Sequence, residues 1–165
     1  LYKQPVLAGA EAHSSMSARA QPFIYQESDG SVVGTHHGAH YFTIGQRRGL
    51  HVGGKPEPLF VIGTDTDKNI VYVGMGDKHP GLYRDGLFIP KADVHWVRPD
   101  LALEAGESTP TMARIRYRQP LQAATLHQTE AGLYVLFATP QRGITPGQFA
   151  AWYQENELIG SGVIA

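Results

Sequence analysis

The stretch Gln122-Ala-Ala-Thr-Leu-His-Gln-Thr-Glu-Ala-Gly-Leu-Tyr-Val-Leu-Phe-Ala138 holds two short apolar runs on either side of a polar segment. The runs, 122–127 and 133–138, are rich in residues that favour strands, and the segment between them contains Gln, Thr, Glu and Gly. Runs of this length are typical of strands and short for helices. The stretch therefore predicts two strands with a short connection.

Similar runs lie on both sides of this pair. They cover residues 112–119, 148–153 and 158–164, and a connecting segment from Leu82 ends in the strand Val94-His-Trp-Val97. Each run is bounded by Pro, Gly, Asn or Glu, which end strands. Six strands with short connections over about eighty residues predict a small six-stranded antiparallel β-barrel, closed or nearly closed.

The upstream part of the chain predicts a second, smaller β-rich domain. Runs 59–62 and 70–73 flank a polar turn, and runs 23–26 and 31–33 flank Asp29-Gly30, so each pair predicts a hairpin. A composition change at Lys78-His-Pro-Gly81 places the domain boundary near Arg84. We expect a mainly β fold in which residues 1–20 are an upstream remnant or linker, 21–84 a central β-rich domain, and 85–165 the C-terminal barrel.

The composition limits the function. The chain has no cysteine, which excludes disulfides, thiolate nucleophiles and zinc-thiolate sites. Its formal net charge is -1, so RNA binding would have to rest on local cationic patches. No apolar run is long enough to span a bilayer and no leader precedes the domains, which predicts a soluble cytoplasmic protein without membrane contact. The start at Leu1 favours a fragment of a longer protein.

The segment Met112-Ala-Arg-Ile-Arg-Tyr-Arg118 holds alternating arginines. As a strand it would place Arg114, Arg116 and Arg118 on one face and Ala113, Ile115 and Tyr117 on the other. Three guanidiniums in a row repel one another unless an anion lies across them, and arginine forks fit phosphate. A solvated strand face that protects a sheet edge is the alternative.

Two further segments are candidates for RNA contact. Arg47 and Arg48 lie in the glycine-rich stretch His40–Gly54, between Gly45-Gln46 and Gly49, where the backbone could follow an RNA strand; a plain surface loop is the alternative. Thr145-Pro-Gly-Gln148 predicts a tight turn with Pro second and Gly third.

Other patterns do not support catalysis or metal binding. His36, His37 and His40 cluster without a carboxylate or cysteine at a recognisable ligand spacing. Asp65, Asp67 and Asn69 begin like a calcium loop, but Ile70 occupies the required glycine position. We therefore expect no catalytic residue, no metal and no bound cofactor in this chain.

The stretch His40–Gly54 is similar to the Thr-x-Gly-Gln-Arg-x-Gly-Leu segment of the tRNA-specific 2-thiouridylases, the MnmA/TrmU family. Further similar segments follow in the same order, and the resemblance spans roughly Gln21 to Ala165. They are Asn69–Gly74 with Gly76–Pro80, His95-Trp96, Arg116–Gln119, and Thr145–Gln148.

The resemblance implies that this chain is the central and C-terminal part of a tRNA-uridine 2-sulfurtransferase. That family joins an N-terminal adenylation domain, which uses ATP, to a central β-rich domain and a six-stranded barrel. A persulfide sulfur donor protein supplies the sulfur for the wobble uridine of tRNA. The family's phosphate-binding loop and cysteines have no counterpart here, so we expect the isolated chain to bind tRNA and to be inactive.

The resemblance also implies which residues contact tRNA. It places tRNA contacts at Arg116, Tyr117 and Gln148, and a tRNA contact of the central domain near Gly45–Gly49. Tyr117 could stack on a base or pack into the barrel, and strand alternation favours the barrel. Charge and loop exposure add the other four candidates, Arg114, Arg118, Arg47 and Arg48.

Two rival functions stay open at this point. The barrel could be a protein-interaction module without RNA binding, which a weak dependence of affinity on salt would indicate. The histidine cluster could instead hold a metal in a freestanding hydrolase, which metal analysis of the purified protein would test.

Overall fold

The computed structural model describes residues 15–165. These residues fall into two compact units, and the division along the chain lies between Tyr83 and Arg84. Residues 22–83 form the first unit, and residues 84–165 form the second together with residues 15–21. Residues 15–20, taken from the sequence as part of a remnant or linker, thus pack with the second unit; the rest of that predicted segment lies outside the described residues.

The first unit is built on one antiparallel strand pair. β1 (Leu59–Asp65) pairs with β2 (Ile70–Met75), and the register shifts at a bulge between Val61 and Gly63. This is the hairpin that the β-branched and aromatic runs predict. Phe60 and Ile62 pack with Leu82 in a small core that Tyr25, Tyr72 and Tyr83 border. Three short 3-10 helices complete the unit: η1 (Glu27–Asp29), η2 (Ala39–Tyr41) and η3 (Pro80–Leu82).

The other predicted hairpin, at 23–26 and 31–33, was wrong. Neither run forms a strand, and η1 occupies the intended turn. The Asp29 carboxylate accepts a hydrogen bond from the Gln26 backbone N–H at 2.8 Å, an alternative to strand pairing that Asp side chains offer. Gly30 has an extended backbone rather than the positive φ of a tight hairpin turn. Ile24 and Val32 stay 78% and 93% exposed, so burial of these two side chains does not compensate for ordering the runs as strands.

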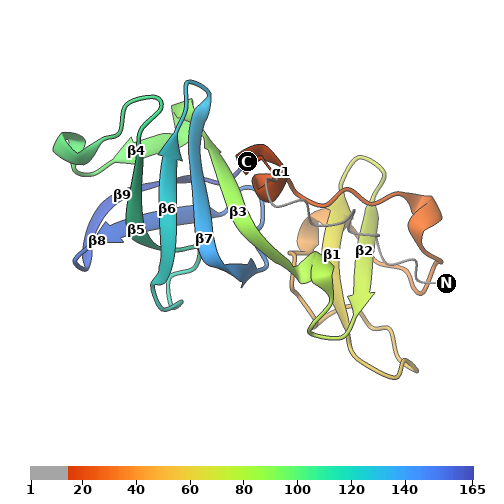
Figure 1. Cartoon of the computed structure of the whole chain (residues 1–165). Coiled ribbons are helices and arrows are strands. Elements are labelled where there is room, and N and C mark those ends of the chain that lie inside the picture. The colour runs from red at the N-terminus through yellow and green to blue at the C-terminus, as the bar shows by residue number, and fades with distance from the viewer. Residues whose placement is uncertain (1–14) are drawn as a thin grey trace. The chain divides into compact units, whose positions relative to one another are not determined.

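The second unit is a curled antiparallel sheet of seven strands in the order β3-β7-β6-β5-β8-β9-β4. Figure 1 shows the curl, with β8 and β9 running across β5, β6 and β7. The fold is therefore mainly β with a barrel-like second unit. The strands are β3 (Tyr83–Pro90), β4 (Val94–Trp96), β5 (Ser108–Arg114), β6 (Gln122–Gln128), β7 (Gly132–Arg142), β8 (Phe149–Gln154) and β9 (Glu157–Val163).

The strand count exceeds the predicted six because the segment from Leu82 to Trp96 holds two strands. β3 and β4 are separated by η4 (Lys91–Asp93) and lie at opposite edges of the sheet. A further short helix, η5 (Pro99–Leu101), precedes β5.

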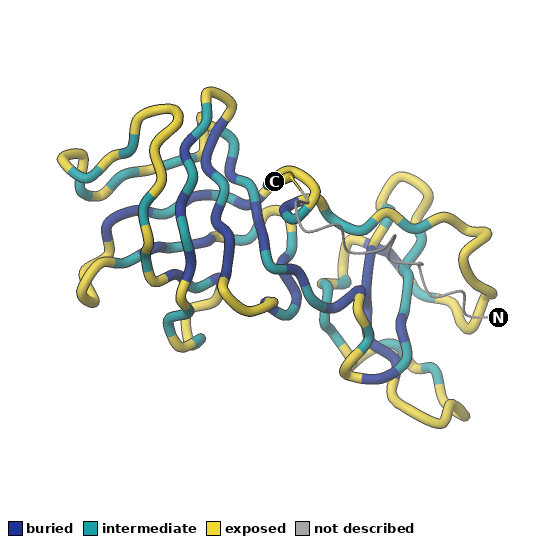
Figure 2. The backbone as a smooth tube through the Cα atoms, viewed as in Figure 1, coloured by how far each residue is buried: buried dark blue, intermediate teal, exposed yellow. Residues whose placement is uncertain are grey.

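The core of this unit lies on the concave side of the sheet. Leu126, Val135 and Trp152 are fully buried, and Trp96 meets Trp152 edge to face with ring centroids 5.5 Å apart. Alternation along the strands separates the two faces, and Figure 2 shows exposed backbone concentrated at the turns between strands. Among the described residues, none of the helices is long and apolar enough to cross a membrane.

A buried arginine fastens α1 (Met16–Ala20) to this unit. Arg84 on β3 is 8% exposed and donates hydrogen bonds to the carbonyl oxygens of Ala20, at 2.5 Å, and Ile144, at 3.1 Å. Burial lowers the pKa of Arg84 to about 10, so the group stays cationic at neutral pH. Arg84 therefore holds both the end of α1 and the segment that follows β7.

Candidate nucleic-acid interface

The segment after β5 leaves the sheet in a tight turn, which we call the 115–119 turn. The Gln119 side chain accepts a hydrogen bond from the Ile115 N–H at 2.9 Å and donates one to the Gln141 side chain at 2.6 Å. β5 makes its last pairing with β8 at Arg114, so a side chain rather than a strand satisfies the next backbone N–H. The predicted strand over 112–119 was therefore too long at its C-terminal end.

The arginine row predicted on that strand was wrong for the same reason. Arg114 is the last residue of β5, whereas Arg116 and Arg118 lie in the 115–119 turn. The three cations are thus gathered at one end of the barrel, but they do not line one strand face. Arg118 is exposed to solvent.

Arg116 connects the turn to the end of β7. Its Nη2 donates to the carbonyl oxygens of Arg142, at 2.8 Å, and Gly143, at 3.1 Å. Burial, together with the nearby charge of Arg142, lowers the pKa of Arg116 from its usual value. A guanidinium carries five N–H donors, so these two contacts leave donors on Arg116 that can meet an anion.

Tyr117 is 85% exposed, which corrects the expectation that it faces the barrel core. The expectation assumed strand alternation, and Tyr117 lies in a turn. Its ring centroid is 5.8 Å from the Arg114 guanidinium carbon. The Arg114 guanidinium also lies 5.0 Å from the Tyr153 ring centroid and donates to Tyr153 Oη at 2.8 Å. Arg114 therefore lies close to two tyrosine rings, and Tyr153 is a residue of this surface that the sequence did not predict.

The turn Thr145–Gln148 forms as its sequence predicts. The Gln148 N–H donates to the Thr145 carbonyl at 3.2 Å, and Gly147 has φ 85°, the positive value that a glycine third in such a turn supplies. The Gly143 carbonyl accepts from both Arg116 and Thr145 Oγ1, each at 3.1 Å. This oxygen therefore joins the 115–119 turn to the turn that carries Gln148.

Gln148 has an unusual side-chain environment. Its Oε1 atom is buried and finds no hydrogen-bond partner within the described part of the chain. An unpaired buried polar atom of this kind is uncommon and costs free energy. A new polar partner could reach this oxygen only if the Gln148 side chain turned outward.

Arg47 and Arg48 lie in a braced loop of the first unit. The Gln46 side chain accepts from the Thr43 N–H at 3.2 Å and donates to the Arg48 carbonyl at 2.8 Å. The backbone of Gln46 and Gly45 bonds to Val61 of β1, so the loop is anchored on the sheet while both arginines stay exposed.

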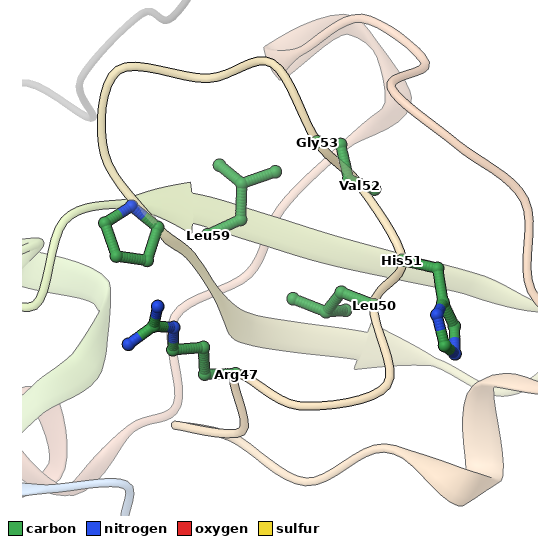
Figure 3. A pocket seen from close by; sticks show the side chains of 7 residues that line it. Arg47, Leu50, His51, Val52, Gly53 and Leu59 are labelled. Atoms are coloured by element: carbon green, nitrogen blue, oxygen red, sulfur yellow. The ribbon is translucent and has the colours of Figure 1, made fainter.

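A pocket of about 380 Å³ opens beside this loop. In Figure 3 the side chains of Arg47, Leu50 and Leu59 face one space, and His51 points away from it. The pocket thus combines an apolar wall with one cation.

The histidine cluster forms internal contacts. His36 Nδ1 accepts from the Gly38 N–H at 3.1 Å, and the His40 ring lies 4.0 Å from the Tyr41 ring. Within residues 15–165 there is no group of three or more His, Cys, Asp or Glu side chains placed to hold a metal ion.

Two family models match the chain. The tRNA methyl transferase PRC-barrel domain matches residues 15–75, and the aminomethyltransferase beta-barrel domain matches residues 88–164. Together they cover most of both units.

Curated relatives that share the name tRNA-specific 2-thiouridylase MnmA match over nearly the whole chain. The protein from Christiangramia forsetii is 64% identical over 146 residues, which are 88% of this chain and 37% of the relative. The Flavobacterium johnsoniae protein is 54% identical over 165 residues, 100% of this chain and 42% of the relative. The Halalkalibacterium halodurans protein is 49% identical over 146 residues, which are 88% of this chain and 38% of the relative. The chain thus spans about two fifths of the length of these relatives.

Proposed function

Because this chain belongs to the tRNA-specific 2-thiouridylase (MnmA/TrmU) family, of which it holds the central and C-terminal domains, we propose that it is the tRNA-binding part of a tRNA-uridine 2-sulfurtransferase. The longer protein would use ATP and a persulfide sulfur donor protein to thiolate the wobble uridine. A chain without cysteine has no thiolate to carry that sulfur, so on its own it binds and does not catalyse.

One observation carries the proposal. The Gly143 carbonyl accepts hydrogen bonds from both Arg116 and Thr145. These two residues are 29 positions apart in sequence, so the shared acceptor brings two distant segments together. Both segments resemble tRNA-contacting motifs of the family, and both lie at the end of β7. A surface assembled from distant motifs around cations suits a folded RNA.

The residues of this surface divide by chemistry. Arg118, exposed in the 115–119 turn, and the remaining donors of Arg116 bind phosphate. The exposed ring of Tyr117 stacks on a base, and the Gln148 amide meets a ribose or base edge. Arg114 acts differently from its neighbours because its guanidinium already lies against two rings.

The first unit supplies a second contact. Arg47 and Arg48 are exposed cations on a loop whose shape is held by Gln46, so they can bind phosphate without first ordering the loop. Their contact with tRNA adds to that of the barrel.

The cleanest test uses Arg118→Gln, because Arg118 is exposed and its loss breaks no hydrogen bond described above. The matched control is Lys91→Gln, an exposed cation in η4. The Lys91 backbone N–H donates to the carbonyl of Ala131, which directly precedes β7, whereas Arg116 donates to the carbonyl of Arg142, the last residue of β7. The control therefore lies at the opposite end of that strand.

The measurement is the affinity of each variant for an unmodified tRNA transcript across a salt series. Loss of a phosphate contact lowers the slope of log affinity against log salt by about 0.7 to 0.9. We expect that change for Arg118→Gln and none for Lys91→Gln. Weak salt dependence of the wild-type chain would favour the protein-interaction module instead.

A further inference from the structure

An apolar and aromatic patch lies on the outward side of β8 and on the parts of β5 and β9 beside it, where Ser161 is the polar neighbour of Ala151. On β8, Ala150 and Trp152 point into the core, so Phe149, Ala151 and Tyr153 point outward. Phe149 is 65% exposed. Cross-strand pairing places Met112 and Leu158 beside Tyr153, and each of the two is 38% exposed. We call this patch the β8 face; its members are Met112, Arg114, Phe149, Ala151, Tyr153 and Leu158.

The β8 face departs from the usual outward side of an antiparallel sheet, which is polar. Its one charged member is Arg114, which pairs with Ala151 across β5 and β8. The neighbouring acid on β9, Glu157, is engaged by Arg98 at 2.8 Å. A contiguous exposed apolar patch on a small domain marks a binding surface.

Arg114 gives this patch a flat, fixed element. Its guanidinium is held by the hydrogen bond to Tyr153 Oη and lies 5.0 Å from that ring. The Tyr117 ring of the 115–119 turn lies 5.8 Å from the same guanidinium. A guanidinium plane and aromatic rings are the groups on which unpaired nucleotide bases stack, at little cost when the side chains are already ordered.

The charges around the β8 face indicate which kind of partner would bind it. Arg114 belongs to the face, Arg116 and Arg118 lie in the turn that follows β5, and the Arg116 side chain bonds to the backbone of Arg142 at 2.8 Å. An apolar protein segment gains nothing from such a cationic border, whereas a nucleic-acid strand places phosphates beside its bases.

We propose that the β8 face is a stacking platform for unpaired bases of the tRNA, continuous with the phosphate contacts of the 115–119 turn. The inference rests on the proposed function and extends it. Arg114 serves here as a stacking group that Tyr153 positions, and Phe149 is a contact residue that no motif identifies.

The test is Phe149→Leu, which removes the ring and retains an apolar side chain on the strand. Its control is Tyr134→Leu on β7, another partly exposed aromatic of the same barrel, which packs on Phe88 rather than on the β8 face. Both are compared with wild type for binding to the unmodified tRNA transcript and to a fully paired RNA duplex, across the same salt series.

We expect Phe149→Leu to weaken tRNA binding about five- to tenfold with an unchanged salt slope, since a stacked base carries no counterion release. The affinity of Phe149→Leu for the duplex, and the affinity of Tyr134→Leu for tRNA, should each change less than twofold. Phe149→Tyr should restore tRNA affinity because it restores an aromatic plane.

The outcomes separate the two proposals. If the wild-type chain does not bind tRNA, the proposed function and the platform both fall. If binding is salt-dependent and sensitive to Arg118→Gln but Phe149→Leu equals wild type, the platform alone is overturned. A wild-type chain that self-associates, and a Phe149→Leu variant that does not, would assign the face to contact between copies of the chain and also overturn it.

Discussion

Arg116 lies 3.1 Å from the carbonyl oxygen of Gly143, to which its Nη2 donates a hydrogen bond. The same nitrogen also reaches the Arg142 carbonyl at 2.8 Å. A residue that resembles a tRNA contact of the family is therefore also a tie within the barrel. Removing it changes the shape of the surface as well as its charge, and the two effects have to be measured separately.

Arg116→Ala should lower both stability and tRNA affinity. Loss of two hydrogen bonds from a partly exposed cation should reduce the free energy of unfolding by about 1 kcal/mol, as urea denaturation followed by tryptophan fluorescence would measure. Arg118→Ala, a matched exposed arginine of the same turn, should stay within about 0.5 kcal/mol of wild type. Equal stability losses in the two variants would contradict the tie to Gly143.

Gln119→Leu should loosen the 115–119 turn without changing its charge. Gln119 Nε2 donates to Oε1 of Gln141, whose residue is 4% exposed, so the variant leaves a buried amide oxygen without that donor. The expected loss of stability is about 1 to 3 kcal/mol.

A double-mutant cycle with Gln141→Leu isolates this interaction, because the second substitution removes the acceptor as well. The double variant should lose less stability than the sum of the single variants. Weaker tRNA binding with an unchanged salt slope should accompany Gln119→Leu. Additive losses would show that the two amides act independently.

The sequence predicted the elements whose local signals and packing agree. The runs at 59–62 and 70–73 are β-branched, flank turn residues and bury side chains, and they form β1 and β2. The run at 23–26 has the same local signals, but only Tyr25 packs against the small core and Ile24 is 78% exposed. Whether a run finds a neighbouring strand to pair with depends on the tertiary structure, and the alternation of its residues cannot predict this.

The end of β5 shows the same limit within the candidate site. The alternation of Met112 to Arg118 fits a strand, yet the strand stops at Arg114 because the Gln119 side chain takes the next backbone N–H. That single competing hydrogen bond moves Tyr117 from the predicted core to the surface. Tyr153 was missed because only the cross-strand register places it opposite Met112. Phe149 was missed because its exposure depends on which face of β8 points outward.

Arg84→Met should destabilise the second unit strongly. The Arg84 guanidinium satisfies the carbonyls of Ala20 and Ile144, and both of those residues are almost fully buried. Leaving two buried acceptors without their donor should cost about 2 to 4 kcal/mol in the free energy of unfolding.

Arg19→Ala is the matched control for Arg84→Met, because Arg19 also ties α1 to β3. It bonds to Asp85 at 2.9 Å, but both side chains are about a third exposed, so its loss should cost less than about 1 kcal/mol. Thermal unfolding of both variants measures the difference. A smaller effect for Arg84→Met than for Arg19→Ala would contradict the assigned role of Arg84.

His79 should make the stability of the first unit depend on pH. Its Nδ1 accepts a hydrogen bond from the Gly81 N–H at 3.0 Å, and burial lowers the pKa of His79 below its usual value. The unfolded chain therefore binds the proton more readily than the folded one. Stability should be at its full value above about pH 6.5 and fall as the pH drops from there to the lowered folded pKa, by at most about 1.4 kcal/mol per pH unit.

His79→Asn separates this titration from the rest of the acid response. An asparagine side chain at the same cap position can accept from the Gly81 N–H and does not titrate. The variant should start less stable, because a ring that lies against Gly74 of β2 is lost, yet it should lose less stability than wild type between pH 7 and 5. Unfolding by urea at a series of pH values gives both slopes. Since the slope comes from the difference between the His79 pKa in the folded and the unfolded chain, parallel slopes for the two proteins would mean that His79 is not the group that titrates.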